Sequence, residues 1–329
     1  MTVIDGFSPF VGQHCETTTT GNLLKAAGLE LSEPMLFGLG GGLSYGVFVI
    51  KAMGMPFIGG RPRLEQITKS LADNLGFRVD YRQTRSAKRA WTNVSEFIDA
   101  GQPVGVKLNS RFLDYFTSNV NFGGHYVAMY GYDSETVSVV DTAQQGGAQV
   151  TNRQRFEDGR LWKGSMASNA MTWTVTVEST DIDWTAVILK AISANAHTYL
   201  RPPIKNFGAK GISKTARLIT DWYDNYDTEA LAQLGVAIDG WGTGGGLFRP
   251  MYAHFLKEAH EHLNQSELLD IADRIDEAGA IWTQISACLT ACVSNGRTSL
   301  ETASEMLDTV AEIEQTAVTR LAMLELDCR

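Results

Sequence analysis

The 329-residue chain has little cysteine, and this argues against two classes of protein. Its four cysteines include no C-x-x-C pair, and their separations do not suggest a disulfide framework, which a chain long enough to bury a core does not need. Cys288 and Cys292 lie four residues apart on an expected helix, but the two histidines that would complete a zinc site are missing. We interpret both as core thiols and expect no metal site.

Long apolar runs are also lacking. No run reaches the ~18 residues that a membrane-spanning helix needs. The first ten residues, MTVIDGFSPF, contain neither the basic region nor the apolar region of a secretory signal. A hydrophobic content of 44% with 20% charged residues predicts a packed core. We therefore expect a soluble, cytoplasmic protein with no membrane partner.

The chain has no excess of positive charge, since its net charge is −9, and this argues against nucleic acid as a partner. The exception is the segment 61–89, in which eight basic residues and three acidic ones give a charge of +5. One interpretation is an ordinary solvated face. The other is a docking surface for an acidic partner, made by the cations Arg82, Arg85, Lys88 and Arg89.

Strand and helix patterns alternate through the first half of the chain. Residues 16–28 predict a helix ending at Gly28, whose run of threonines requires that packing hold it in place. Apolar runs on both sides of Asp133-Ser134-Glu135 predict a β-hairpin. Long amphipathic helices are expected from about residue 184. We therefore expect two domains: residues 1–180, which are α+β, and residues 181–329, which are mainly helical.

Two segments share the pattern G-x-G-G-G-L, at 38–43 and 242–247. Neither is a phosphate-binding P-loop, because no Lys-Ser or Lys-Thr pair follows, and neither fits G-x-G-x-x-G. Glycine runs of this kind allow positive φ and close approach of the backbone. They are either ordinary tight turns or two loops that line one cleft and offer free N–H groups to a ligand.

The sequence contains one candidate set for nucleophilic catalysis. Cys15 stands at the start of the first predicted helix, where the partial positive charge favours a thiolate. His125 follows two glycines and begins an apolar strand, and Asp141 ends the partner strand of the hairpin. In an antiparallel hairpin that turns near Ser134, His125 and Asp141 lie almost opposite each other, so the carboxylate could orient the imidazole. A cysteine and a histidine taken from any chain are more often structural, and spacing alone leaves this possibility open.

These residues also resemble a known family. The segments HCETT, LSE and FGLGGGL, then GQPV before a strand and GGHYVAMYGYD followed by VVD, resemble the papain-like, peptidase C39-like cysteine fold. Together with GTGGGLFRPMYAHFLKEA in the second half, they look more closely like the butirosin-biosynthesis acyltransferases. The resemblance implies a central helix packed on an antiparallel sheet, followed by a mainly helical domain.

The resemblance also implies chemistry. Cys15 would be the nucleophile, His125 the general base and acid, and Asp141 the orienting group. The reaction would transfer an acyl group from a thioester of phosphopantetheine, on an acyl or peptidyl carrier protein, to the amine of a small molecule in antibiotic biosynthesis. No bound cofactor is expected. The acidic partner of the segment 61–89 would then be the carrier.

The remaining candidate residues are less specific. The backbone N–H of Cys15 and the side chain of Gln13 are candidates for the oxyanion hole, although papain-type enzymes place their glutamine further upstream. Candidates for substrate binding are Glu33, Gly40, Gly41, Ser44, Tyr45, Gly244 and Arg249.

Three functions stay open at this point. A thioesterase or a peptidase-like amidase would use the same three residues, and a non-catalytic binding protein of this fold would use none. The amphipathic C-terminal helices bury either against the first domain or against a second subunit, so a homodimer is also open.

Overall fold

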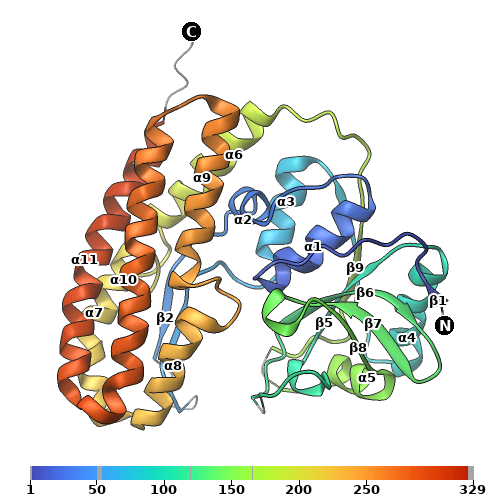
Figure 1. Cartoon of the computed structure of the whole chain (residues 1–329), viewed down its shortest axis with the longest axis horizontal. Coiled ribbons are helices and arrows are strands. Elements are labelled where there is room, and N and C mark those ends of the chain that lie inside the picture. Colours follow the sequence, from blue (N-terminus) through green and yellow to red (C-terminus); the bar gives the residue numbers. More distant parts are fainter. Residues whose placement is uncertain (1, 50–53, 119, 165, 325–329) are drawn as a thin grey trace. The chain divides into compact units, whose positions relative to one another are not determined.

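The computed structural model describes residues 2–49, 54–118, 120–164 and 166–324, so Ile50 and Cys328 lie outside the described residues. The chain divides into two compact units (Figure 1). The first comprises Met1–Leu36 and Leu64–Ile182, and the second comprises Phe37–Arg63 and Asp183–Arg329. The second unit thus begins two residues after the boundary expected from the sequence, but it also takes in residues 37–63, which we expected in the first domain.

The first unit is built on an antiparallel sheet with the strand order β4-β9-β5-β6-β7-β8, and β1 pairs with the end of β6. β6 and β7 form the predicted hairpin, with a register shift between Met129 and Gly131. The strands are β1 (Thr2–Val3), β4 (Arg78–Arg82), β5 (Val104–Leu108), β6 (His125–Tyr132), β7 (Thr136–Val140), β8 (Ala148–Asn152) and β9 (Thr172–Thr176).

Helix α1 (Cys15–Ala26) packs on the sheet, against β6, β5, β9 and β7. Its threonines, Thr17–Thr20, are all buried. Threonine is a poor helix former, so packing rather than intrinsic propensity holds this helix, as the sequence suggested. A second set of apolar side chains, including Val94, Ile98 and Phe156, packs with the strands in one core cluster. The other helical segments of this unit are α3 (Gln66–Leu75), α4 (Ala87–Asp99), η2 (Ser110–Phe112), η3 (Ala143–Gln145) and α5 (Arg153–Leu161).

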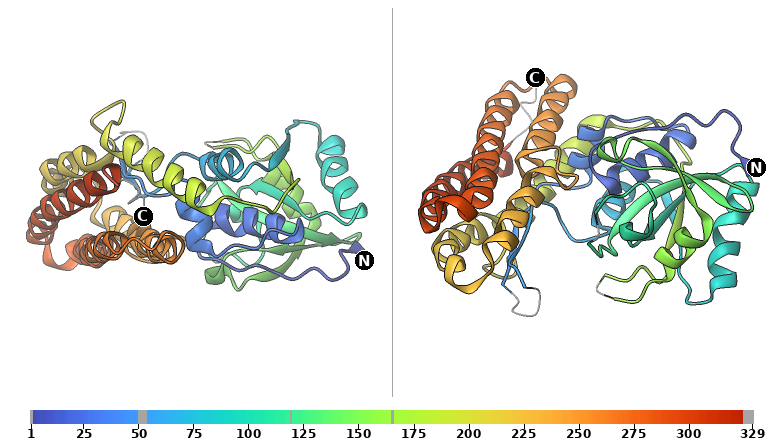
Figure 2. Two further views of the ribbon diagram at one scale, coloured as in Figure 1. Left: turned by 90° about the horizontal axis from the view of Figure 1, so that it is seen from above. Right: turned by 60° about the horizontal axis from the view of Figure 1, so that its bottom comes forward.

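The second unit is mainly helical, and α10 and α11 lie side by side in it (Figure 2). A two-stranded ribbon of β2 (Gly46–Phe48) and β3 (Phe57–Gly59) places Tyr45 and Val47 in the same core cluster as Trp282. This shared burial is why residues 37–63 belong with the helices. The helices are α6 (Trp184–Leu200), α7 (Gly208–Asn225), α8 (Thr228–Gly240), η4 (Gly246–Phe248), α9 (Arg249–Leu263), α10 (Glu267–Asn295) and α11 (Arg297–Ala322), while α2 (Glu33–Leu39) begins in the first unit and ends in the second.

The predicted fold class is confirmed: an α+β part with a central helix on an antiparallel sheet precedes a helical part. Among the described residues, no helix has the length and apolarity needed to cross a membrane. The same residues contain no group of three or more His, Cys, Asp or Glu side chains placed to hold a metal ion.

Candidate active site

Cys15 is the first residue of α1 and is half-buried. The residue before it, His14, has extended backbone angles, and its side chain does not cap the helix. The first N–H groups of a helix have no partner within the helix, and they carry the positive end of the helix dipole. The thiol of Cys15 therefore stands at a place that favours negative charge.

His125 and Asp141 meet across the β6–β7 hairpin. The register pairs Ala128 with Val140, so one step further Asp141 is level with Val127, two residues from His125 on the same face. The Nε2 atom of His125 lies 2.8 Å from Oδ2 of Asp141, and both side chains are buried. From the sequence we expected His125 and Asp141 to lie almost opposite each other. In the structure their side chains are in direct contact.

Cys15 belongs with this pair, because its thiol is one of the groups that raise the pKa of His125. Nε2 of His125 is used by Asp141, so Nδ1 is the ring nitrogen that stays available to another partner. Burial by itself lowers the pKa of His125. The charge and hydrogen bond of Asp141, and the contact with Cys15, outweigh burial and raise that pKa to about 10. The imidazole is thus poised to carry a proton at neutral pH beside the thiol.

Glu33 holds the segment that leads into Cys15. Its carboxylate accepts the backbone N–H of Gln13 at 2.7 Å and that of His14 at 2.8 Å. It also accepts the hydroxyl of Thr17 at 2.8 Å. Glu33 is one of the candidates for substrate binding, and in the structure its carboxylate has these three internal partners. The Gln13 side chain is exposed, and its place in an oxyanion hole stays a prediction.

Gly12 is required by the same arrangement. A Cβ atom on it would lie 2.5 Å from Oε1 of Glu33, closer than any real Cβ contact. The carbonyl of Gly12 accepts the N–H of Ala143 at 2.8 Å, two residues beyond Asp141. The segment before Cys15 is therefore tied both to α2 and to the segment that carries Asp141.

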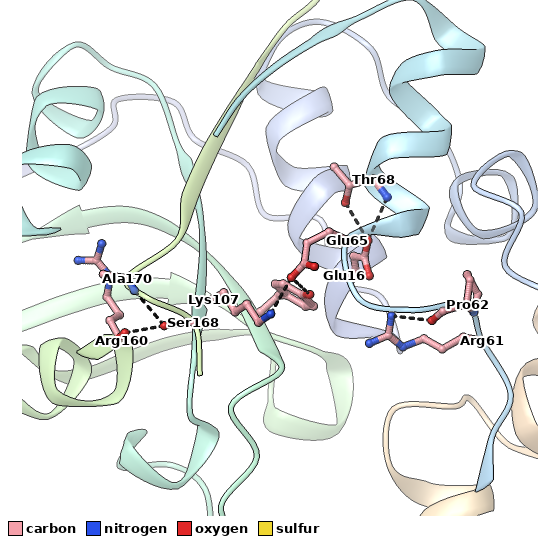
Figure 3. A network of polar contacts seen from close by, with 10 residues as sticks. Glu16, Arg61, Pro62, Glu65, Thr68, Lys107, Arg160, Ser168 and Ala170 are labelled. Atoms are coloured by element: carbon pink, nitrogen blue, oxygen red, sulfur yellow. Dashed lines mark hydrogen bonds and ion pairs between the residues drawn. The ribbon is translucent and has the colours of Figure 1, made fainter. Parts of the chain in front are cut away.

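Buried polar contacts support the two strands and the helix behind these residues (Figure 3). Glu16, next to Cys15, accepts the N–H and the hydroxyl of Thr68 at 3.0 and 3.1 Å. Glu65 accepts Nζ of Lys107 at 2.7 Å and the hydroxyl of Tyr126, the neighbour of His125, at 2.8 Å. These contacts fix the backbone on which the nucleophile and the imidazole stand.

In both glycine runs, N–H groups that we had considered for binding a ligand have internal partners. The N–H of Gly41 bonds to the carbonyl of Gly38, and that of Gly42 bonds to the carbonyl of Phe37, which caps the end of α2 in a Schellman motif. Gly40, which we expected to bind substrate, is a buried part of this cap.

The second run, at residues 242–247, is organised by a side chain. Asp239 accepts the N–H of Gly246 at 2.8 Å, while Gly244 is exposed with a φ of +69°. The start of the first run lies close to the end of the second, since the rings of the flanking residues Phe37 and Phe248 stack with 5.4 Å between their centres. Both runs therefore have structural roles within the second unit.

Three other candidates for substrate binding have internal partners in the second unit. Arg249 is fully buried, with Nε and Nη2 each 2.8 Å from the carboxylate of Glu314. Tyr45 is fully buried, and its hydroxyl lies 2.5 Å from that of Thr215. The N–H of Ser44 donates to the carbonyl of Gly60. The sequence could not show this, because the partners of Arg249 and Tyr45 come from helices more than 60 residues away.

The expected basic cluster is divided by the structure. Arg82 bonds to Asp80 and Glu96, each at 3.3 Å, and stacks on Phe97. Three cations are exposed and form no ion pair with the described residues: Arg85, Lys88 and Arg89, all at the start of α4.

Two residues at this site were not foreseen. The hydroxyl of Tyr115 donates to Oδ2 of Asp141 at 2.9 Å. The ring of Phe116 meets the imidazole of His125 edge-on, with 5.0 Å between the ring centres. Both lie in the long connection between β5 and β6, which has no helical or strand period and so gave no signal in the sequence.

Two family models match the chain. Residues 14–142 match the model described as butirosin biosynthesis protein H, N-terminal. The matched range includes Cys15, His125 and Asp141. Residues 154–321 match a domain of unknown function, DUF4872. A search of curated proteins found no match.

Two crystal structures are similar to part of the chain. One is described as a C39-like peptidase from Bacillus anthracis; it is 21% identical, with 54% of this chain and 98% of that chain covered and a TM-score of 0.38. The other is the peptidase domain of Streptococcus ComA, described as a bi-functional ABC transporter involved in a quorum sensing pathway. It is 15% identical, with 52% and 96% covered and a TM-score of 0.33.

Proposed function

This chain belongs to the family that joins the N-terminal domain of butirosin biosynthesis protein H to the domain of unknown function DUF4872, and on that basis we propose that it is a cysteine-dependent acyltransferase. The observation that supports this most is the group at the start of α1. A thiol at a helix N-terminus acts on the pKa of an imidazole that is paired with a buried carboxylate. This is the arrangement of an activated nucleophile with its base and its orienting group.

The proposed reaction has two steps through an acyl-enzyme. The thiolate of Cys15 attacks the carbonyl carbon of a thioester, the bond to the leaving sulfur breaks, and the proton of His125 passes to that sulfur. The amine of the acceptor then attacks the acyl-Cys15 carbonyl, His125 takes the proton from the nitrogen, and the thiolate is released. Asp141 stabilises the imidazolium at the start and the end of this cycle.

The oxyanion of each step needs hydrogen-bond donors. The Glu33 carboxylate uses the N–H groups of Gln13 and His14, so these two do not serve. The N–H of Cys15, at the open end of α1, is the backbone donor that we assign to the oxyanion.

We also propose that the donor is carried by an acyl or peptidyl carrier protein, which docks at the start of α4. Arg82, the last residue of β4, pairs with Thr172 of β9, and Thr172 pairs with Val106 of β5. Two residues further along β5, Leu108 pairs with His125 of β6. The exposed cations Arg85, Lys88 and Arg89 follow β4 directly in the chain. They therefore stand at the same end of the strands as His125. Their charge suits an acidic carrier and an anionic phosphopantetheine arm.

The test is intact mass spectrometry after incubation with a panel of acyl-pantetheine thioesters, followed by product analysis with and without an amine. An acyl adduct on Cys15, absent in Cys15→Ala and converted to an amide by the amine, is the expected result. An adduct that yields only the free acid would make the chain a thioesterase or amidase. No adduct with any thioester, from a folded protein, would favour a binding protein.

Carrier docking is tested by reversing three charges. The variant Arg85→Glu/Lys88→Glu/Arg89→Glu should raise the KM for a carrier-bound donor about tenfold and leave the reaction of free acyl-pantetheine unchanged. The matched control reverses three exposed cations of the second unit: Lys205, Lys210 and Arg217. Equal effects of the two triple variants would contradict the docking site.

A further inference from the structure

The described residues of the connection between β5 and β6 form hydrogen bonds with one another and with β8. At its base, the Asn109 side chain bonds to Oδ1 of Asn121 and to the N–H of Phe122, and the N–H of Ser110 bonds to the carbonyl of Phe122. Further along, the carboxylate of Asp114 accepts the N–H of Asn152 at 2.7 Å. The loop is thus closed at its base and fixed to the end of β8.

The next residue of the loop, Tyr115, reaches the paired carboxylate of the candidate site. Its hydroxyl donates to Oδ2 of Asp141, the same oxygen that contacts Nε2 of His125. The other oxygen, Oδ1, accepts the N–H of Thr142 at 2.6 Å. Among the described residues, the carboxylate therefore has three donors, and Tyr115 is the one that is neither a catalytic candidate nor a backbone N–H.

We propose that Tyr115 is a positioning residue of this site, which acts through Asp141 to fix the carboxylate and to limit how strongly it holds the proton of His125. The expected effect on catalysis rests on the proposed function, whereas the expected effect on the titration of His125 depends only on these side chains. A donor on Oδ2 disperses the negative charge of Asp141. Less of this charge is then available to the imidazolium, which keeps His125 able to release its proton.

The groups that act on His125 are few and come from three segments. Cys15 faces it from α1 and Asp141 faces it from the end of β7, and both raise the pKa of His125. Tyr115 from the β5–β6 loop acts through Asp141. Burial, and then the charge of Asp141, raise the pKa of Tyr115 well above its usual value, so this hydroxyl keeps its proton and stays a donor.

The change to test is Tyr115→Phe, which keeps the ring and removes the donor. We expect the titration of His125 to move to higher pH, and the rate of acyl transfer to fall about tenfold because the carboxylate is less well fixed. The titration is followed by NMR of labelled histidine in the Cys15→Ala background, where the contribution of the thiol is absent. The His125 signal is identified by its loss in His125→Gln.

Tyr132→Phe is the matched control. Tyr132 lies at the opposite end of β6 from His125, and the change removes a tyrosine hydroxyl that donates to the carboxylate of Asp99. It should leave the His125 titration unchanged. The effect of Tyr115→Phe should also disappear in an Asp141→Asn background, which a merely structural role would not produce.

A His125 titration that Tyr115→Phe leaves unmoved, or moves equally with and without Asp141, would overturn the proposal. The readout needs no substrate, so a failure of the proposed acyltransferase would be seen separately, as the absence of an acyl adduct on Cys15.

Discussion

At the scale of single residues, the account depends on the pair His125 and Asp141. Burial lowers the pKa of a histidine, so a buried imidazole without a partner would be neutral at pH 7. The Asp141 carboxylate first, and then Cys15, reverse this effect and raise the pKa of His125 to about 10, against an ordinary value near 6.5. Asp141 thus contributes most to keeping the imidazole protonated at neutral pH.

Replacing that carboxylate should change the dependence of stability on pH. Because the pKa of His125 is raised by folding, the stabilisation from this pair is fully present below about pH 6.5 and is lost as pH rises through about 10. In Asp141→Asn we expect this loss to be absent, because the amide cannot stabilise the cation. Urea unfolding of both proteins at pH 6, 8 and 10 measures the difference.

The control is Asp99→Asn. Asp99 is exposed, and among the described residues its carboxylate accepts a hydrogen bond only from Tyr132. The stability of this variant should depend on pH as that of the wild type does. If the wild type and Asp141→Asn lose stability in parallel from pH 6 to 10, the assigned state of His125 is wrong.

At the scale of elements, α1 and the segment before it hold Cys15, the proposed nucleophile. The sequence correctly predicted this helix and its position relative to Cys15. The next helix is capped by Ser32, whose hydroxyl accepts the N–H of Met35. The sequence did not predict that the Glu33 carboxylate would bind the backbone of Gln13 and His14. A carboxylate near a candidate site has several uses, and only the folded geometry selects among them.

We expect Glu33→Gln to destabilise this segment by about 1–3 kcal/mol. The N–H groups of Gln13 and His14 bond to different oxygens of the carboxylate, and the NH₂ group of a glutamine would face one of them without accepting its hydrogen bond. The alkylation rate of Cys15 should fall with it. Thermal unfolding and peptide mapping after alkylation measure the two effects.

Glu30→Gln is the matched control, because Glu30 is exposed and forms only a surface pair with Lys25 among the described contacts. Its effect should stay within about 0.5 kcal/mol. If the two variants have equal effects, the contacts of Glu33 with the backbone do not position Cys15.

At the scale of the whole molecule, two units of different construction have separate cores. The sequence predicted the α+β part, the helical part and the approximate start of the latter. It could not assign residues 37–63, because Tyr45 and Ile58 join a core whose helical members begin at Ile212, more than 150 residues away. For the same reason Arg249 was a candidate for substrate binding, since neither Glu314 nor Trp282 is near it in sequence.

The buried pair of Arg249 and Glu314 gives a test of this reassignment. Arg249→Met should reduce the free energy of unfolding by about 3–5 kcal/mol, because it leaves the Glu314 carboxylate buried without its cation. Trp282, whose indole N–H donates to Glu314 at 2.9 Å, reports the loss by its fluorescence in urea.

Arg217→Met, an exposed arginine of the same unit, is the control. A small loss of stability in Arg249→Met together with a large rise in KM would restore the original interpretation of Arg249 as a substrate-binding residue.

The measurement that tests the central claim most directly is the alkylation rate of Cys15 between about pH 4 and 10, in the wild type and in His125→Ala, by intact mass and peptide mapping. Cys288 and Cys292 are internal references, because burial raises the pKa of both thiols. The account predicts that Cys15 reacts faster than these thiols well below pH 8, and that His125→Ala removes this advantage. Equal reactivity of the three thiols below pH 8, or a fast Cys15 that does not depend on His125, would contradict it.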